Sequence, residues 1–381
     1  MPKIAVVTNL APGLNGGIQR FAKSLLACAR PPSHTVDLVY LEASVGDRHP
    51  RAVQKWFDQN VEQKVPSSED QRTATELVRR LSHYNLIIVA GSAPLLLRWG
   101  YALRRIIESG CAPVVYSALF PMQEMEYYLG LGRSRQLAEV IGPLIATSTA
   151  TAVPSDYSAG GIRRFLGNGT ALVKVPLGVD VVLPMGPPDL PHTPRSYVAA
   201  VSRLDPLAAH KNIASVLECW PDVVRLTPEA GLVLIGSGGQ KLQPASYMIR
   251  TGGVSDDRRS AIVARSHAFV FPSAIEAFGL AAAEALALGT PVIAMRCGAM
   301  PELVVHGANG YLVDAEEVEV HLGDHHGMHL RPNREQLVTA LSSLMDEACR
   351  AGMRAAAADS VKHLTWRRVL DTYLRLGGIA P

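Results

Sequence analysis

Two carboxylates stand in an otherwise small and apolar run, PSAIEAFGLAAAEALALGTPVIA, from Pro272 to Ala294. Glu276 and Glu284 are eight positions apart, and eight residues at about 100° each bring a helical side chain back to within about 80° of its starting direction. A carboxylate is a good acceptor for vicinal hydroxyls, such as those of a ribose or a sugar ring. The pair therefore predicts a site for a hydroxyl-rich ligand. The alternative is a helix cap at Glu276 and a surface charge at Glu284.

The elements that must hold these residues alternate between strands and helices. Before residue 180, apolar runs predict strands at 3–10, 36–43, 85–91, 113–120 and 142–149, with helices at 20–30, 77–84 and 97–110. After residue 195, strands are predicted at 197–204, 230–236, 267–273 and 290–295, with helices at 213–226, 256–266 and 277–289. This alternation predicts an α/β protein with two doubly wound, Rossmann-like domains that face each other across a cleft.

A segment with five prolines, Val179–Ser196, separates the two series. We expect an N-terminal domain at 1–180, a linker at 181–195 and a C-terminal domain at 196–363, with the final helix (364–381) crossing back to the first domain. Residues 314–333 are polar and rich in histidine, and they read as a loop insertion. His321, His325, His326 and His329 follow no recognised ligand spacing, so no metal site is expected there.

Composition narrows the function classes. The chain has 381 residues, 48% of them hydrophobic, and a net charge of only +3, which gives no reason to expect nucleic acid as a partner. Its five cysteines form no CxxC pair, the N-terminus does not resemble a signal peptide, and no apolar run is long enough to span a bilayer. We expect a cytoplasmic protein. Arg98, Arg104 and Arg105 could make a weak peripheral membrane contact, although a core position is favoured for the apolar face of their helix.

Predicted strand ends and helix starts indicate where a ligand would bind. In open α/β sheets ligands lie beyond the carboxyl ends of the strands, and Pro272 stands at such an end. Phe278–Leu280 then begin a helix whose first N–H groups favour a phosphate or a polar ligand. Gly16 and Gly17 follow the first strand, where they allow close approach of the backbone to a ligand. Asp256 and Asp257 are expected to cap the helix that they begin.

The run E-A-F-G-L-A-A-A-E resembles the E-x7-E motif of retaining GT-B glycosyltransferases, and its flanking residues resemble glycosyltransferase family 4. Further motifs similar to that family follow the family's order along nearly the whole chain. They are Gly16-Gly17, Pro176–Asp180, Arg203 with His210-Lys211-Asn212, Ile235–Gly238, Cys297–Glu302 and Asn309–Val313. Each motif is weak alone, and the set is what carries the resemblance.

The resemblance implies roles for residues of the C-terminal domain. Glu284 would hold the ribose of a nucleoside-diphosphate sugar, Glu276 would contact the donor sugar, and Arg203 and Lys211 would hold the diphosphate. Two fixed cations stabilise the charge that a departing diphosphate gains, so no metal or other cofactor is expected. The resemblance also implies retention by front-face displacement. Further donor contacts are expected at Gly16, Gly17, Gly236, Gly253, Val254, Ala277, Phe278, Gly279 and Leu280.

Two departures from the family pattern stand out. Arg203 and Lys211 are eight positions apart, whereas the family usually places them about six apart, so Leu207–Ala209 are expected to form an inserted bulge. The segment PMQEMEYY also lacks the histidine that many relatives carry after the corresponding strand. We therefore expect a small molecule or a saccharide as the acceptor, with a lipid-linked carrier as the open alternative. The acceptor-side candidates are Gln19, Ser92, Gln123, Glu124 and Tyr127.

Three alternatives compete with a glycosyltransferase. GLNGGIQ follows the first strand and Glu42 ends the second, as in a nicotinamide-dinucleotide oxidoreductase, but the loop is not G-x-G-x-x-G and nothing after residue 195 is explained. A non-catalytic partner with a degenerate GT-B fold would not need Glu276, Glu284, Arg203 and Lys211. A GT-B sugar-nucleotide epimerase or hydrolase would act on the donor without a separate acceptor.

Overall fold

The computed structural model describes residues 1–9, 17–29, 33–42, 55, 57–58, 66–184, 186–190, 196–204, 206–238, 242–322 and 325–381. These residues form two compact units. Met1–Gly178, His321–His326 and Thr365–Pro381 belong to the first, unit 1, and Val179–Val320 and Gly327–Leu364 belong to the second, unit 2. Apart from the short segment His321–His326, the chain leaves unit 1 at Gly178 and returns to it at Thr365, just before its last helix.

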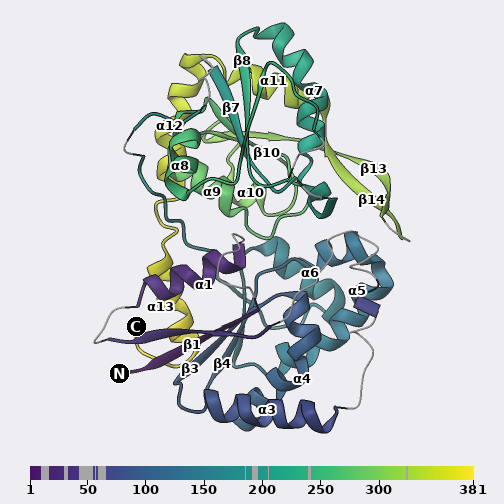
Figure 1. Ribbon diagram of the computed structural model, residues 1–381, viewed down its shortest axis with the longest axis vertical. Helices are drawn as coiled ribbons and strands as arrows, with labels where there is room; N and C mark the ends of the chain where they lie inside the picture. Colours follow the sequence, from purple (N-terminus) through teal and green to yellow (C-terminus); the bar gives the residue numbers. More distant parts are fainter. Residues whose placement is uncertain are drawn as a thin grey trace. The chain divides into compact units, whose positions relative to one another are not determined.

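Unit 1 is built on a parallel six-stranded sheet with the order β2-β1-β3-β4-β5-β6 (Figure 1). The strands are β1 (Lys3–Thr8), β2 (Thr35–Tyr40), β3 (Leu86–Gly91), β4 (Val114–Ala118), β5 (Ala150–Val153) and β6 (Val173–Lys174). The helices include α1 (Gly17–Ala27), α3 (Ser68–Leu81), α4 (Ala93–Ser109), α5 (Met122–Thr147), α6 (Asp156–Leu166) and α13 (Trp366–Leu376).

Unit 2 holds a second parallel sheet with the order β12-β11-β10-β7-β8-β9. The strands are β7 (Ser196–Val201), β8 (Ala230–Ile235), β9 (Met248–Gly252), β10 (Ala268–Phe271), β11 (Val292–Met295) and β12 (Gly310–Val313). The helices are η1 (Pro206–Lys211, a 3-10 helix), α7 (Ile213–Leu226), α8 (Asp256–Arg265), α9 (Leu280–Ala287), α10 (Met300–Leu303), α11 (Arg334–Ser343) and α12 (Glu347–Ser360). The prediction of two doubly wound α/β domains is confirmed.

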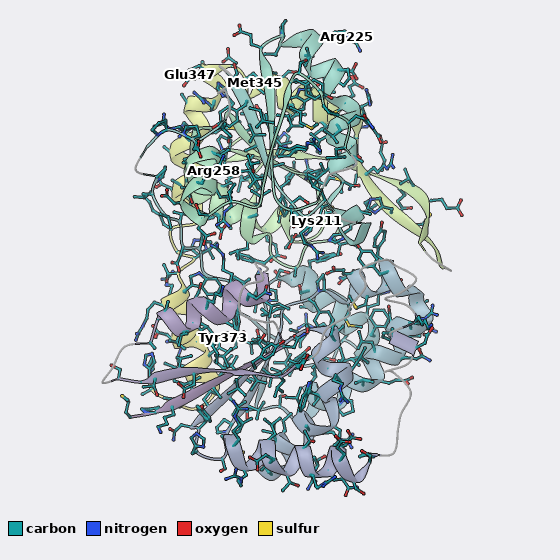
Figure 2. All side chains as sticks on the ribbon, in the orientation of Figure 1. Lys211, Arg225, Arg258, Met345, Glu347 and Tyr373 are labelled. Carbon is teal, nitrogen blue, oxygen red and sulfur yellow. The ribbon has the colours of Figure 1, made fainter. Side chains whose placement is uncertain are left out.

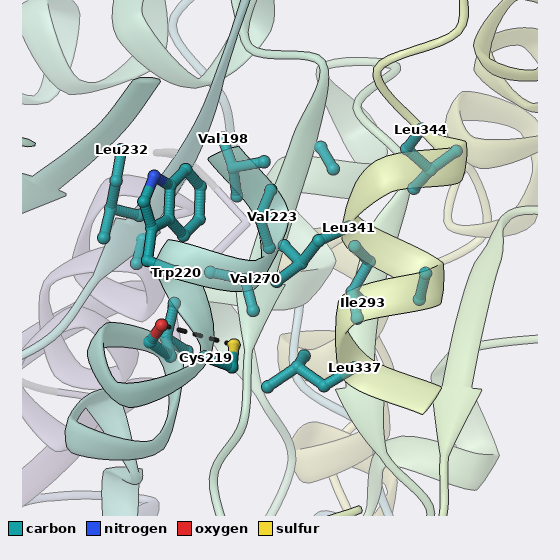
Figure 3. Packing of buried hydrophobic residues seen from close by; sticks show 14 of the residues in the cluster. Val198, Cys219, Trp220, Val223, Leu232, Val270, Ile293, Leu337, Leu341 and Leu344 are labelled. Atoms are coloured by element: carbon teal, nitrogen blue, oxygen red, sulfur yellow. Dashed lines mark hydrogen bonds between the residues drawn. The ribbon is translucent and has the colours of Figure 1, made fainter. Parts of the chain in front are cut away.

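The core of unit 2 explains why these segments fold as they do. Figure 3 shows Trp220 of α7 and Leu341 of α11 packed against alternate strand residues such as Val198, Leu232 and Val270. Burying a large apolar side chain of this kind contributes about 1.5–3 kcal/mol relative to leaving it exposed. The helical period of the apolar residues in 213–226 predicted α7 at its observed bounds.

The strand predicted at 142–149 is wrong, because residues 142–147 are the last part of α5. The buried residues Leu137, Ala138, Ile141, Leu144 and Ile145 follow a helical period that continues through the segment. Short apolar runs fit a strand or a buried helix equally well, and only the longer period separates the two. The strand that does pair with β4 is β5, which starts at Ala150.

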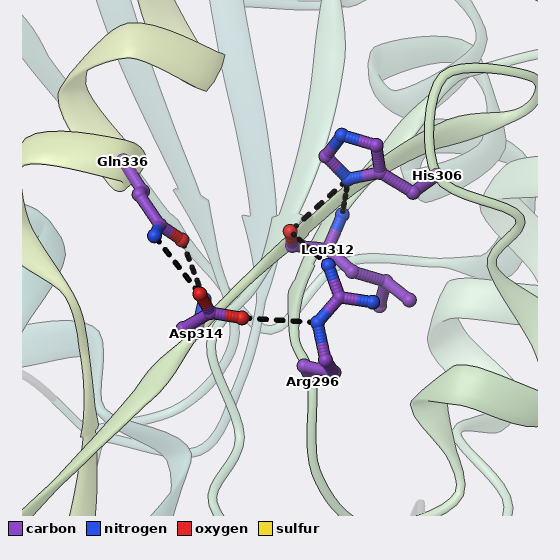
Figure 4. A network of polar contacts seen from close by, with 5 residues as sticks. All are labelled: Arg296, His306, Leu312, Asp314 and Gln336. Carbon is purple, nitrogen blue, oxygen red and sulfur yellow. Dashed lines mark hydrogen bonds and ion pairs between the residues drawn. The ribbon is translucent and has the colours of Figure 1, made fainter.

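The predicted loop insertion at 314–333 is also wrong, because most of it is a two-stranded hairpin of β13 (Ala315–Leu322) and β14 (His325–Pro332). A polar network fixes the base of this hairpin (Figure 4). Asp314 accepts a hydrogen bond from Gln336 at 3.0 Å and pairs with Arg296 at 3.0 Å. Those two partners, Gln336 first, hold the pKa of Asp314 below its usual value.

The last helix, α13, is a structural part of unit 1. Its residues Trp366, Leu370 and Tyr373 are buried. The Phe21 ring makes edge contacts with Trp366 and Tyr373 at centroid distances of 6.0 and 5.7 Å. The Tyr373 hydroxyl lies 2.5 Å from the Ser117 hydroxyl on β4. The helix is therefore fixed to the sheet of unit 1 by both apolar and polar contacts.

The apolar face of α4 is also core, with Leu95, Leu96, Leu103 and Ile106 buried. Arg104 and Arg105 of the same helix form ion pairs with Glu108. None of the helices in the described ranges combines the length and the apolar character that crossing a bilayer requires.

Candidate active site

The strand order of unit 2 locates the site. β7 pairs with β8 on one side and with β10 on the other. The order of the strands in the sheet therefore switches from one side of β7 to the other, and the switch point lies between β7 and β10. Ligands of open α/β sheets bind beyond the carboxyl ends of the strands at such a switch point. Arg203 follows β7, and the loop from Pro272 to Gly279 follows β10. The residues singled out in the sequence thus flank the switch point.

Lys211 and Glu276 form an ion pair at this edge, 2.6 Å from Nζ to Oε2. Lys211, labelled in Figure 2, ends η1, and its Nζ lies 5.7 Å from the centre of the Phe271 ring. The two side chains are 25% and 18% exposed, so the pair is held by the protein and still open to a ligand. A cation and a carboxylate side by side can hold a phosphate oxygen and a sugar hydroxyl, respectively.

Backbone contacts fix the loop that carries Glu276. The Glu276 carbonyl accepts a hydrogen bond from the Ala299 N–H at 3.0 Å, and the Ala274 N–H donates to the His210 carbonyl at 2.8 Å. Gly298 has a φ of 59°, and a Cβ there would lie 3.1 Å from the Glu276 nitrogen. The loops after β7, β10 and β11 therefore hold one another in place.

Glu284 lies one turn inside α9 and is only 7% exposed. Its partner is Arg259 of α8, at 3.2 Å, which also pairs with Asp256 at 2.9 Å. Burial of a carboxylate requires such an opposite charge. The surface-charge alternative for Glu284 is thus wrong. Arg259 was missed in the sequence, where DDRR gives only a local signal for its contact with Asp256.

The start of α9 is formed by Gly279, whose φ of 87° favours glycine. The helix begins at Leu280, so the predicted helix start is confirmed, and Gly279 has no side chain to cap the first N–H groups. Ala277 and Phe278 are buried and Leu280 is half-buried. Glu276 precedes the cap residue Gly279 by three positions, so it does not cap α9. The alternative that Glu276 is only a helix cap is therefore wrong.

Glycines bring two further loops to the same edge. Gly236 has a φ of 139°, and a Cβ there would collide with the Ser202 carbonyl oxygen. Its N–H donates to the Gly252 carbonyl at 2.9 Å. Beside it, Gly253 is exposed and Val254 is half-buried. The backbone after β8 and β9 can thus approach a ligand at the end of β7.

Two smaller expectations for unit 2 need correction. The inserted bulge at 207–209 is part of the 3-10 helix η1, which takes up the extra residues between Arg203 and Lys211 as a regular turn. Asp256 and Asp257 stand in the first turn of α8, but the cap is Ser255, which accepts a hydrogen bond from the Arg258 N–H. Ser255 occupies the N-cap position, where its hydroxyl reaches the third N–H of the helix.

The acceptor-side candidates are placed in unit 1, and several have structural partners. Ser92 caps α4 and donates to Asn9 Oδ1 at 2.6 Å. Gln123 donates to the Tyr157 carbonyl at 3.1 Å. The remaining candidates are Gln19 and Tyr127, both buried, and Glu124, half-buried in the first turn of α5.

Asn9, which follows β1, was missed in the sequence because a lone asparagine after a strand looks like an ordinary turn residue. Gly17 is the first residue of α1, whereas Gly16 lies outside the described residues.

The histidine-rich segment gives one well-defined contact. His329 is buried on β14, where its Nε2 lies 2.7 Å from Asn212 Oδ1. The side chains of His321, His325 and His326 lie outside the described residues. Among the side chains that are described, no three histidine, cysteine or acidic groups gather as metal ligands would.

Residues 195–324 match the family model described as "Glycosyl transferases group 1". A GDP-mannose-dependent monoacylated alpha-(1-6)-phosphatidylinositol monomannoside mannosyltransferase from Corynebacterium glutamicum is 26% identical, over 83% of this chain and 86% of its own length.

Two solved structures show the same fold. HepE from Anabaena, in complex with UDP-glucose, has a TM-score of 0.69 at 17% identity and covers 98% of both chains. Sucrose-phosphate synthase from Thermosynechococcus elongatus has a TM-score of 0.73 at 17% identity, over 99% of this chain and 98% of its own.

The two parallel sheets and the structural likeness define a two-domain protein of the GT-B fold. The family match over residues 195–324 and the mannosyltransferase relative support a group 1 glycosyltransferase, an enzyme of the transferase class. These matches favour a transferase over the dinucleotide oxidoreductase and over the non-catalytic partner.

Proposed function

We propose that the protein is a retaining, metal-independent glycosyltransferase that moves a sugar from a nucleoside-diphosphate sugar to an acceptor hydroxyl. The observation that carries the proposal is the partly open Lys211–Glu276 ion pair at the β7–β10 switch point. The buried Glu284, eight residues further along the same segment, supplies a second carboxylate.

Each group has a part in the proposed reaction. Glu284 accepts hydrogen bonds from the ribose hydroxyls, and Glu276 accepts them from the donor sugar. Lys211 and Arg203 hold the diphosphate, which gains negative charge as the glycosidic bond breaks. The acceptor hydroxyl attacks from the same face, and its proton passes to the leaving phosphate oxygen. The protein contributes position and charge stabilisation, with no nucleophile of its own.

The donor is a UDP-sugar or a GDP-sugar. A UDP-glucose complex of a protein with the same fold supports the first, and the GDP-mannose-dependent relative supports the second. The acceptor is a saccharide, a small molecule or a lipid-linked carrier. The name of the Corynebacterium relative, which acts on a phosphatidylinositol monomannoside, supports the lipid-linked kind. Five free cysteines fit a reducing compartment, and we place the reaction in the cytoplasm.

A thermal-shift panel tests this proposal with UDP, GDP, ADP, TDP and NAD, each with and without magnesium. A ligand that binds the native state raises the melting temperature by mass action. We expect a shift with one nucleoside diphosphate, independent of magnesium and lost in Glu284→Ala. A shift that requires magnesium would overturn metal independence, and a shift with NAD alone would overturn the donor assignment. Detection of a glycoside product from the matching sugar donor separates transfer from epimerisation or hydrolysis.

A further inference from the structure

His329 lies far from the donor-site motifs in the sequence and next to them in space. It belongs to the hairpin strand β14, and no motif of the predicted site includes it. Its side chain is nevertheless only 5% exposed, and its Nε2 lies 2.7 Å from Oδ1 of Asn212, which is the residue after Lys211.

Asn212 occupies an unusual position. It has a φ of 54°, in the left-handed region, and it begins α7 without using its side chain as a cap. Asparagine tolerates this conformation better than most residues. Its Nδ2 donates instead to the carbonyl oxygens of Pro272 at 3.0 Å and Leu330 at 2.7 Å. The side chain of Asn212 thus joins the turn after Lys211 to the end of β10 and to β14.

These two hydrogen bonds determine the role of the imidazole. Both protons of the Asn212 amide point to carbonyl oxygens, so the amide oxygen faces His329 and His329 Nε2 must donate. Burial, followed by the nearby Arg331, lowers the pKa of His329 to about 4. The ring is therefore neutral near pH 7, with its proton on the nitrogen that faces Asn212.

The hairpin can hold this contact because its base is fixed. Asp314 lies directly before β13 and accepts hydrogen bonds from the side chains of Arg296 and Gln336 (Figure 4). Gln336 belongs to the first turn of α11. The N–H of Asn333, directly after β14, donates to the Asp314 carbonyl at 2.8 Å. The base of the hairpin is thereby closed. A histidine on β14 can act as a fixed donor, which a flexible loop could not provide.

We propose that His329 is a positioning residue for Lys211, acting through Asn212, so that the hairpin β13–β14 is part of the framework of the donor site. The inference rests on the proposed role of Lys211. If Asn212 loses its donor, the left-handed turn loses one of its restraints, and Nζ of Lys211 moves relative to Glu276 and the diphosphate. A displacement of about 1 Å at a catalytic group can lower the rate by up to about 100-fold.

Two variants of His329 separate positioning from general stability. Gln places an amide nitrogen near the position of Nε2 and keeps the donor, whereas Leu has no donor. We expect His329→Leu to lower kcat about 10-fold with little change in the KM for the donor. We expect His329→Gln to stay within about threefold of the wild type. Met328→Thr, on the exposed neighbouring residue, is the matched control and should leave kcat unchanged. If the Leu variant does not fold, His329→Asn, whose amide is too short to reach, replaces it.

A double-mutant cycle then tests the route through Lys211. In a Lys211→Ala background, His329→Leu should cause no further loss of kcat. A further loss of about 10-fold, or a kcat of His329→Leu equal to that of the wild type, would overturn the inference. The proposed function fails separately, if the wild type neither binds a nucleoside diphosphate nor transfers a sugar. The proposed function stands without the inference if Lys211→Ala shows the expected large loss of kcat while His329→Leu is fully active.

Discussion

The loops at the carboxyl ends of the two sheets carry different chemistry. In unit 2 they present charged groups, with Lys211 paired to Glu276 and a buried Glu284 paired to Arg259. In unit 1 the described positions after β1 and β3 present neutral groups, Asn9 and Ser92, hydrogen-bonded to each other. Charged groups can bind a diphosphate, whereas neutral donors and acceptors can bind hydroxyl groups or form hydrogen bonds within the protein. The comparison teaches that one scaffold, used twice, is specialised by its loops.

The largest expected effect comes from removing a cation of unit 2. Lys211→Ala and Arg203→Ala should each lower kcat by about 10²–10³-fold, because each removes a charge that stabilises the departing diphosphate. Initial rates with the matching sugar donor measure this. Lys362→Ala, which removes an exposed cation of the same unit, should leave the rate unchanged. Wild-type rates in both site variants would show that the cations of unit 2 do not contribute to catalysis.

A glycine substitution tests whether the loop geometry of unit 2 is as constrained as its charges. Gly236→Ala should destabilise the protein by on the order of 3 kcal/mol, since its φ of 139° is unfavourable for alanine and the new Cβ would collide with a backbone carbonyl. In unit 1, a Cβ added to Gly160 of α6 would meet no atom within 4 Å, and Gly160→Ala should be neutral or slightly stabilising. Urea denaturation of both variants measures the two effects. Equal stabilities of the two variants would contradict a tight backbone geometry at Gly236.

Acid should weaken the wild type more than His329→Gln. The folded pKa of His329 is about 4 and its ordinary value is 6.5, so between these values the unfolded chain takes up a proton that the native state does not. Stability from this group is therefore complete above pH 6.5 and is lost as the pH falls toward 4. At about pH 5 the loss is on the order of 2 kcal/mol. The free energies of unfolding of the wild type and of His329→Gln, measured near pH 7.5 and near pH 5, test this prediction. If both proteins lose the same stability between the two pH values, the side chain of His329 is solvated rather than buried.

The smallest effect is expected in unit 1. Ser92→Ala removes the cap of α4 and the hydrogen bond to Asn9, which should lower stability by about 1 kcal/mol. Because this role is structural, kcat and the KM for the acceptor should change less than about twofold. A large rise in the acceptor KM at unchanged stability would instead make Ser92 an acceptor contact. The positions of Asn9 and Ser92, after β1 and β3, would then form a binding surface.

Local patterns predicted much of the fold and the residue types of the site. Apolar periods marked α7 at its observed bounds, and strand ends followed by glycine or polar residues marked the loops of Arg203, Gly236 and Glu276. Patterns failed where two structures share a short signal. The end of α5 looked like a strand, and the polar hairpin β13–β14 looked like a loop.

The sequence by itself determined two doubly wound domains, a helix that starts within Phe278–Leu280 and the two carboxylates eight residues apart. These features depend on backbone preference and on side-chain period over a few turns. Only the tertiary structure decided the partners. Arg259 meets Glu284 because α8 and α9 pack together. Asn212 meets His329 across 117 residues because the hairpin returns beside the end of β10. Such contacts depend on strand order and packing, which no local spacing encodes.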